Sequence, residues 1–297
     1  MVVNVLCAYD RDMSALEQAY QHCQCVTAAH YENFPVASHL LPKKLRRPIS
    51  VIYTFARSAD DFADEGDFSK AQRHEKLDDY SAKLNTIENA GAINDPVFIA
   101  LADVIKKHAL PLSLFHDLLT AFKMDVDKTR FADFAEILNY CHYSANPVGR
   151  LLLHLNNTAS PQNLIQSDAV CSALQLINFY QDLQQDYQEN DRIYLPQDEM
   201  QQFKVSEHHL QQTCSDAAMQ ALMDLQLQRA TALLQKGHSL GNRQTGRFGL
   251  ELRMMIHGGA HVLASLREHR GNVFRRPRLS KSAILQIAFK ALFRISV

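Results

Sequence analysis

Apolar residues recur at every third or fourth position through most of this chain, which is the spacing of amphipathic α-helices. Glycine and proline are scarce, at 10 and 9 of 297 residues against roughly 7% and 5% in an average protein, so turns are few. The pattern argues against a many-stranded sheet and predicts an all-α protein with one short extended segment at 192–196. We expect helices over 10–28, 46–64, 69–88, 96–108, 111–125, 133–155, 168–189, 206–240, 246–270 and 281–295.

The connections between these expected helices are short, and neither a linker nor an internal repeat interrupts them. The sequence therefore predicts a single domain over 1–297 whose helices surround a central space, with a basic amphipathic tail at about 280–297. Between Leu266 and Val297 the only acid is Glu268, whereas basic residues are frequent. We expect this end of the chain to attract anions.

Composition narrows the class of protein. Lys and Arg total 31, Asp and Glu total 32, and 46% of residues are hydrophobic, as in a soluble globular protein. No run reaches the roughly 18 apolar residues of a membrane-spanning helix, and the N-terminus lacks the basic start of a signal peptide. Six scattered cysteines favour reduced thiols, so we expect a cytoplasmic protein. Basic residues without interleaved aromatics argue against a nucleic-acid partner.

The first informative motif is a pair of aspartates within the helix expected at 46–64. Asp60 and Asp64 are four residues apart, so their carboxylates lie on one face of the helix, about one turn apart. Two acids in this position repel each other, and a positive charge between them would relieve the repulsion. A single pair of this kind is more often found on a solvated helix face.

A second pair, Asp182 and Asp186, lies about 120 residues later, with Asn178 one turn ahead of it. Apolar residues surround both pairs in sequence, so both helices are expected to be buried and their acidic faces to border a polar interior. Mg²⁺ suits such carboxylates, because it retains waters and also binds phosphate oxygens. The two pairs together predict a helical cavity in which a diphosphate ester is ionised.

Five segments, at 30–38, 60–64, 143–150, 178–186 and 192–196, resemble the squalene/phytoene synthase family. The resemblance covers roughly 15–280. Within the family, Pro35 after Phe34, the Asn-Pro-Val-Gly run at 146–149 and the start of the second aspartate motif most resemble the bacterial hydroxysqualene synthase branch (HpnC type) of hopanoid biosynthesis.

This resemblance implies a class I isoprenoid synthase fold with two or three Mg²⁺ ions at a diphosphate. It implies presqualene diphosphate as the substrate, made from two farnesyl diphosphates by a sister synthase. Ionisation, rearrangement and capture by water would give hydroxysqualene, which a separate flavin reductase would convert to squalene. No NADPH is expected, and the sequence has no glycine-rich dinucleotide fingerprint.

Residue roles follow from the resemblance position by position. For Arg57, which the resemblance implies binds the diphosphate, the alternative is an ion pair with a neighbouring carboxylate. For Tyr53, which it implies lines the cavity, the alternative is a core tyrosine. The basic run at 275–278 either closes over the diphosphate, contacts anionic lipid, or is a solvated loop. The implied roles are metal binding by Asp60, Asp64, Asp182 and Asp186, with Asn178 beside them; diphosphate binding by His30, Asn33, Arg57, Arg192 and Arg275; and cavity lining by Phe34, Tyr53 and Tyr143.

Two departures from condensing members of the family concern the chemistry. Gln181 replaces the usual arginine before Asp182, which we interpret as one diphosphate to bind rather than two. Asn146-Pro147 replaces a small-residue pattern. We therefore count Tyr53, Asn146, Asn178 and Gln181 as catalytic candidates, with Asn146 or Gln181 orienting the water. The alternative for Asn146-Pro147 is a helix kink. Asn272 stands where relatives often carry a tyrosine.

The tail helix either lies on a membrane interface, as a peripheral contact, or docks on the protein body. Two other functions remain open at this stage. One is head-to-head condensation of two farnesyl diphosphates to presqualene diphosphate or squalene. The other is a non-catalytic assembly factor of the same fold, which the four aspartates disfavour.

Overall fold

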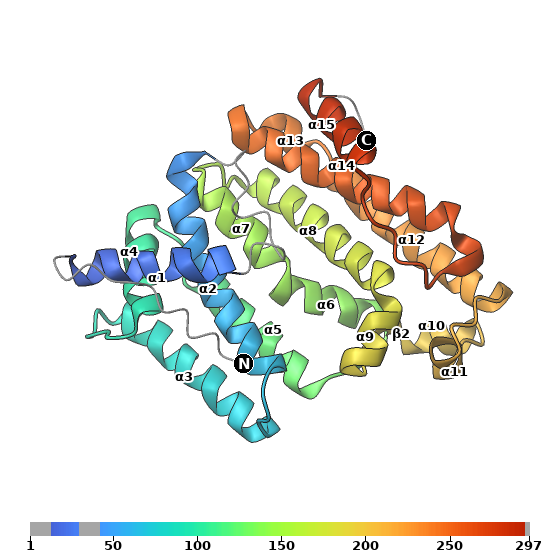
Figure 1. Cartoon of the computed structure of the whole chain (residues 1–297), viewed down its shortest axis with the longest axis horizontal. Helices are drawn as coiled ribbons and strands as arrows, with labels where there is room; N and C mark the ends of the chain where they lie inside the picture. The colour runs from blue at the N-terminus through green and yellow to red at the C-terminus, as the bar shows by residue number, and fades with distance from the viewer. Residues whose placement is uncertain (1–12, 30–41, 295–297) are drawn as a thin grey trace. The chain divides into compact units, whose positions relative to one another are not determined.

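The computed structural model describes residues 13–29 and 42–294 (Figure 1). The chain divides into two compact units, one comprising Met1–Asp127 with Arg150–Ala159 and the other Lys128–Gly149 with Ser160–Val297. The single domain expected from the sequence stays a prediction. The all-α fold class is confirmed.

The first unit is helical, and short connections join its helices between residues 43 and 127 (Figure 1). Several helices begin where the sequence predicts. Ser69 and Gln72 form a reciprocal capping box, and Asp95 accepts a hydrogen bond from the Val97 amide with Pro96 in the first turn. The helices are α1 (Ala15–Ala29), α2 (Lys43–Asp64), α3 (Lys70–Glu88), α4 (Pro96–His108) and α5 (Ser113–Asp127), together with the part of α7 (Asn146–Leu155) that begins at Arg150.

Helix α2 packs against α1, α3, α4 and α5. Its Phe55 is fully buried, with ring centroids 5.4 Å from Phe115, 5.6 Å from Tyr80 and 5.9 Å from Phe98. With 3.6 residues per turn, this burial fixes the rotation of α2 about its axis. The side of the helix opposite Phe55 then carries its charged residues.

The second unit contains the remaining helices and a two-stranded parallel sheet. Its elements are β1 (Arg130–Phe131), α6 (Phe134–Ser144), the start of α7 (Asn146–Leu155), α8 (Pro161–Gln181), α9 (Leu183–Asn190), β2 (Ile193–Pro196), α10 (Gln197–Gln202), α11 (Glu207–Gln211), α12 (Ala217–Gly237), α13 (Leu240–Arg243), α14 (Gly246–Glu268), the 3₁₀ turn η2 (Arg270–Asn272) and α15 (Lys281–Leu292).

Helix α8 packs against α12 and α14 at the centre of this unit. Two glycines permit the close approach. A Cβ atom at Gly237 would lie 2.5 Å from the carbonyl oxygen of Gln166, and one at Gly259 would lie 2.6 Å from the Leu174 side chain. Larger residues at these two positions would push the helices apart.

Three expected helices are interrupted. The one expected over 133–155 breaks at Ala145 into α6 and α7, because Pro147 has no amide hydrogen to donate to the preceding turn. The one expected over 168–189 breaks at Asp182, and the one over 206–240 becomes α11, α12 and α13. Strand β2 confirms the extended segment at 192–196, whereas β1 was not anticipated.

Cys23, Cys141, Cys171 and Cys214 are free. Cys25 is disulfide-bonded, so the expectation of reduced thiols is wrong at this position. In the part of the chain that the structure describes, no helix combines the length and the apolarity needed to span a membrane.

Candidate active site

The first acidic cluster lies on the charged side of α2. Arg57 is at its centre, with Nη1 3.2 Å from Asp60 Oδ2 and Nη2 2.6 Å from both Asp61 Oδ1 and Glu65 Oε1. Arg57 therefore forms ion pairs with neighbouring carboxylates, and its role in diphosphate binding stays a prediction. One guanidinium faces three carboxylates here, so the cluster has an excess of negative charge.

Asp60 and Asp64 occupy the same face of α2 one turn apart, as the spacing predicts. The Asp60 side chain is 40% exposed and Asp64 is also exposed. Tyr53 lies one turn before Arg57. Burial raises its pKa and so do the charges of Asp60 and Asp61, while Arg57 lowers it, so the phenol stays protonated at neutral pH.

Arg73 on α3 fixes the end of α2. Its guanidinium donates to the carbonyl oxygens of Phe62, Ala63, Glu65 and Gly66 at 2.7–3.2 Å. These carbonyls include groups that the end of a helix leaves without intrahelical donors. Arg73 therefore orients the turn that carries Asp64 and Glu65. Sequence reasoning missed this residue, since an arginine in the first turn of α3 has no distinguishing pattern.

The second acidic cluster lies where α8 ends and α9 begins. Asp182 is the junction, so Asp182 and Asp186 are not on one uninterrupted helix as expected. The Asp186 amide nevertheless donates to the Asp182 carbonyl oxygen at 2.9 Å, which keeps the two residues one turn apart. Asn178, at the end of α8, is exposed.

Arg276 forms a two-bond ion pair with Asp182. Nε lies 2.5 Å from Oδ1 and Nη2 lies 3.0 Å from Oδ2, and the Asp182 side chain is only 12% exposed. Gln181 donates from Nε2 to the carbonyl oxygen of Pro277 at 2.5 Å. These two contacts hold residues 275–278, which we call the basic strap, against the second cluster.

Burial dominates the electrostatics of this cluster. It raises the pKa of Asp182, an effect that Arg276 opposes. Burial and the charge of Asp182 together raise the pKa of Asp186 to about 7, although Arg192 lowers it. Crowded, partly buried carboxylates of this kind are hard oxygen donors whose charge a divalent cation would neutralise, so their chemistry fits Mg²⁺.

The core of the second unit positions this cluster. The ring of Phe179 stacks on Tyr194 of β2 with centroids 3.6 Å apart and planes 4° from parallel. Tyr180 is fully buried and donates to Gln226, whose amide donates to Glu199, which in turn binds Arg229 at 2.6 and 2.8 Å. The residues on both sides of Tyr180 are thereby fixed relative to α12.

The structure places the other candidates as follows. Asn146, at the start of α7, is buried and accepts a hydrogen bond from Ser172 Oγ at 3.0 Å, within the second unit. Tyr143 is half-buried on α6, and Arg275 lies exposed in the basic strap. Arg192 lies two residues after the end of α9, and its amide donates to the Asp186 carbonyl oxygen at 3.0 Å. His30, Asn33 and Phe34 lie outside the described residues.

Each unit thus brings together the candidates that it contains. Tyr53, Arg57, Asp60 and Asp64 share one side of α2, and Gln181, Asp182, Asp186 and Arg192 gather around α9. Among the described residues, no three histidine, cysteine or acidic side chains are close enough together to hold a metal ion. Each cluster supplies a pair of candidate aspartates.

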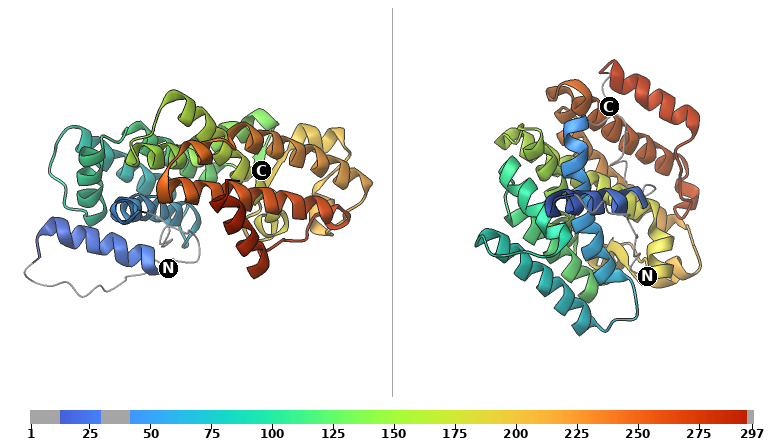
Figure 2. Two further views of the ribbon diagram at one scale, coloured as in Figure 1. Left: turned by 90° about the horizontal axis from the view of Figure 1, so that it is seen from above. Right: turned by 60° about the vertical axis from the view of Figure 1, so that its left-hand side comes forward.

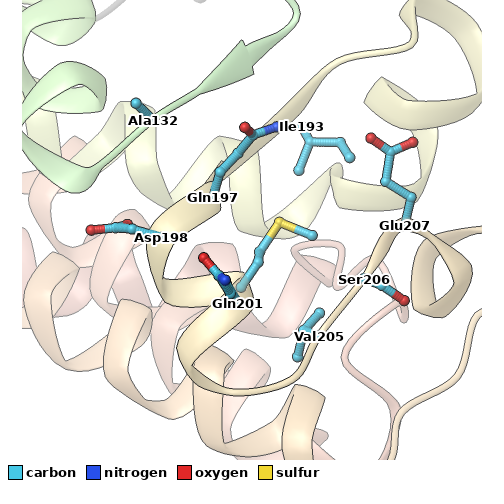
Figure 3. A pocket seen from close by; sticks show the side chains of 9 residues that line it. Ala132, Ile193, Gln197, Asp198, Gln201, Val205, Ser206 and Glu207 are labelled. Carbon is cyan, nitrogen blue, oxygen red and sulfur yellow. The ribbon is translucent and has the colours of Figure 1, made fainter.

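A pocket of about 610 Å³ in the second unit is a separate feature (Figure 3). None of the candidates from the sequence lines it. Its two acids are Asp198 and Glu207, of which Glu207 pairs with Arg130 Nε at 2.8 Å, and none of the described residues that line it is basic, so the pocket is not suited to bind a diphosphate. It is lined by Ala132, Ile193, Gln197, Asp198, Met200, Gln201, Val205, Ser206 and Glu207.

The fold is that of an all-helical isoprenoid synthase. The squalene synthase HpnC from Alicyclobacillus acidocaldarius has a similar structure, with a TM-score of 0.80, 32% sequence identity, and 86% of this chain and 96% of that chain covered. Residues 27–283 match the sequence profile of the squalene/phytoene synthase family. The chain belongs to this family.

Two curated relatives represent different activities. A hydroxysqualene synthase from Rhodopseudomonas palustris is 37% identical over 229 residues, covering 75% of each chain. A phytoene synthase from Mycobacterium tuberculosis is 32% identical over 193 residues, covering 65% of this chain and 62% of the relative. Sequence similarity alone therefore does not decide between these two activities, and the chemistry of the site has to be considered.

Proposed function

We propose that this protein converts presqualene diphosphate and water to hydroxysqualene and diphosphate. The observation that carries the proposal is the arrangement at Gln181. At the position where condensing members have an arginine, this chain has an amide bonded to the basic strap, and the strap supplies a single arginine, Arg276, to Asp182. The similarity to a named hydroxysqualene synthase supports the same choice.

The aspartates of each cluster would hold Mg²⁺ through their own carboxylates: Asp60 and Asp64 in one, Asp182 and Asp186 in the other. Bound Mg²⁺ would supply the positive charge that stabilises the departing diphosphate. Arg57 and Arg276 each pair with carboxylates of their own cluster in the structure. The planar fork of either guanidinium group would suit it to turn to phosphate oxygens of a diphosphate bound at its cluster.

The reaction balances without a reductant. The carbon–oxygen bond of the ester breaks with its electron pair going to the diphosphate, the resulting cation rearranges, and a water oxygen bonds to carbon. The proton that the water releases goes to the diphosphate or to solvent. No hydride donor enters this step, so NADPH is not required.

Two amides in the second unit are suited to orient the water. Gln181 already uses Nε2 as a donor to Pro277, and Asn146 uses Oδ1 as an acceptor from Ser172. We propose that the attacking water forms its hydrogen bond with Gln181 Oε1 or with Asn146 Nδ2. An amide can orient water without acting as a strong base toward the cation. Tyr143, in the same unit, would line the cavity beside it.

Condensation of two farnesyl diphosphates is the second candidate, because a phytoene synthase is 32% identical to the chain. In the proposed pathway a sister synthase supplies presqualene diphosphate, and a flavin reductase consumes the alcohol. A non-catalytic role is disfavoured, since both aspartate pairs are present.

The test is incubation of the purified protein with Mg²⁺ and either farnesyl diphosphate or presqualene diphosphate, followed by mass spectrometry of the products. Hydroxysqualene from presqualene diphosphate alone supports the proposal. Turnover of farnesyl diphosphate would support condensation, and no product from either substrate would support the non-catalytic role. Asp60→Asn with Asp182→Asn is the inactive control.

A further inference from the structure

We propose that α15 is a membrane-docking helix that binds anionic phospholipid. In the described part of the chain, large exposed apolar side chains are concentrated at one place. All of them except Phe68 and Ile165 lie between Leu279 and Phe293. Exposed apolar side chains scattered singly are ordinary, whereas a contiguous group of this kind marks a binding surface.

Helix α15 is attached to the second unit by one face. Ala283, Ile287 and Ala291 recur every four residues and are buried. Helix α15 lies beside α14 (Figures 1 and 2) and packs against it. Arg253 of α14 is buried and links α15 to α13. Its Nε donates to the Ala291 carbonyl oxygen at 2.6 Å and its Nη1 to the Gly241 carbonyl oxygen at 2.8 Å. The helix is therefore formed and fixed in place before it meets a partner.

The opposite face of α15 is apolar as well. Leu285 is 72% exposed, Leu292 62% and Phe289 58%, and with 3.6 residues per turn they lie across the helix from the buried alanines. A helix that is apolar on both sides is typical of one buried on both sides, and the body of the protein covers only one side. We name these three residues and the adjacent Ile284 and Phe293 the outer face.

The charges around the outer face favour binding to an anionic lipid surface. Arg278, Lys281, Lys290 and Arg294 are all exposed, and within the described residues none of them forms an ion pair. No acidic residue occurs between His269 and Val297. Cations bordering large apolar side chains are the pattern of a helix that lies in the interface of an anionic bilayer.

A second copy of this chain suits the outer face less well. Pairing two copies would bring the same cations together and leave them without counter-charges. Helix α15 has 12 residues and is about 18 Å long, which is short for the roughly 800 Å² that each partner buries in a stable dimer. A bilayer imposes no such minimum area.

The proposal is tested by co-sedimentation of the full-length protein with vesicles of phosphatidylcholine alone or mixed with phosphatidylglycerol. We expect binding to the mixed vesicles and at least tenfold weaker binding to phosphatidylcholine alone. Leu285→Ser with Phe289→Ser should weaken binding about tenfold or more, because both side chains leave the bilayer. Lys281→Gln with Lys290→Gln should weaken binding to the mixed vesicles by about fivefold per charge.

Ile165→Ser is the matched control, since Ile165 is 57% exposed on α8 and lies outside α15. It should bind vesicles as the wild type does, and circular dichroism should show all variants folded. The proposal is overturned if the wild type binds neither vesicle, or if Ile165→Ser weakens binding as much as the α15 variants. It is also overturned if α15 instead supports a dimer, seen in sedimentation velocity, that Leu285→Ser with Phe289→Ser dissociates.

Discussion

Arg276 binds Asp182 through both Nε and Nη2, across 94 residues of sequence. The pair joins the C-terminal basic strap to the aspartate at the junction of α8 and α9. It places a cation on one of the carboxylates that we assign to Mg²⁺. The protein thus balances its second acidic cluster internally, and a metal ion would compete with Arg276 for Asp182.

Replacing Arg276 with glutamine should therefore destabilise the metal-free protein by about 1–2 kcal/mol, because Asp182 would remain largely buried without its partner. The Arg276 side chain is 44% exposed, so the loss of stability should be smaller than for a fully buried ion pair. Urea unfolding measures it. Saturating Mg²⁺ with diphosphate should shrink the difference from wild type, and an unchanged difference would contradict the competition between Arg276 and metal.

Replacing Asp186 with asparagine should stabilise the metal-free protein at pH 8. The Asp186 pKa is raised to about 7, so the folded state binds this proton more tightly than the unfolded state does. Stability therefore falls as the pH rises from the ordinary aspartate pKa near 4 to about 7 and levels off above that, so the wild type should melt at a lower temperature at pH 8 than at pH 6. Asp186→Asn removes the charge and should reduce this difference.

The same variant should lose function as it gains stability. We expect kcat to fall by about 100-fold or more, because a carboxylate assigned to the metal is gone. Mg²⁺ should also raise its melting temperature less than that of the wild type. Glu268→Gln, exposed at the end of α14, is the control. If this variant gained as much stability and lost as much activity as Asp186→Asn, the effects would come from a general change of charge.

Replacing Gln181 with arginine should change the products. It removes the hydrogen bond to the Pro277 carbonyl oxygen and adds a second cation beside Asp182. The fraction of hydroxysqualene formed from presqualene diphosphate should fall, as measured by mass spectrometry. Gln188→Arg, exposed on α9, makes the same charge change and should leave the product ratio unchanged. If both Gln181→Arg and Asn146→Ala leave that ratio unaltered, neither amide orients the water.

Replacing Glu199 with glutamine should destabilise the second unit by about 2–4 kcal/mol, since Arg229 and Gln226 would lose a buried carboxylate. Denaturant unfolding measures the change. Asp79→Asn breaks an exposed pair with Lys83 and should cost less than about 1 kcal/mol. Equal effects of the two variants would mean that the chain from Tyr180 to Arg229 adds little to stability.

Much of the fold could be predicted from residues that are close together in the sequence. Helix starts at Ser69 and Pro96 depend on hydrogen bonds between residues two or three positions apart, and both were predicted correctly. The face shared by Asp60 and Asp64 follows from helical periodicity in the same way. The family assignment depends on motifs that are each contiguous in the chain, and it is confirmed.

The missed features depend on distant partners. The break at Asp182 occurs where the basic strap binds, and Arg73 and Arg276 acquire their roles from carbonyls and carboxylates on other elements. An arginine at either position looks like any solvated cation in the sequence. The metal ligands, the water-orienting amides and the single-domain arrangement stay predictions.

The sequence by itself determined the helices, their caps, the two aspartate pairs and the family, because each depends on residues within a few turns of one another. Only the tertiary structure decided that Gln181 and Asp182 bind the basic strap, that Arg73 holds the end of α2, and that α15 is apolar on both sides. These outcomes depend on which side chains meet after folding, and the sequence does not record those distances.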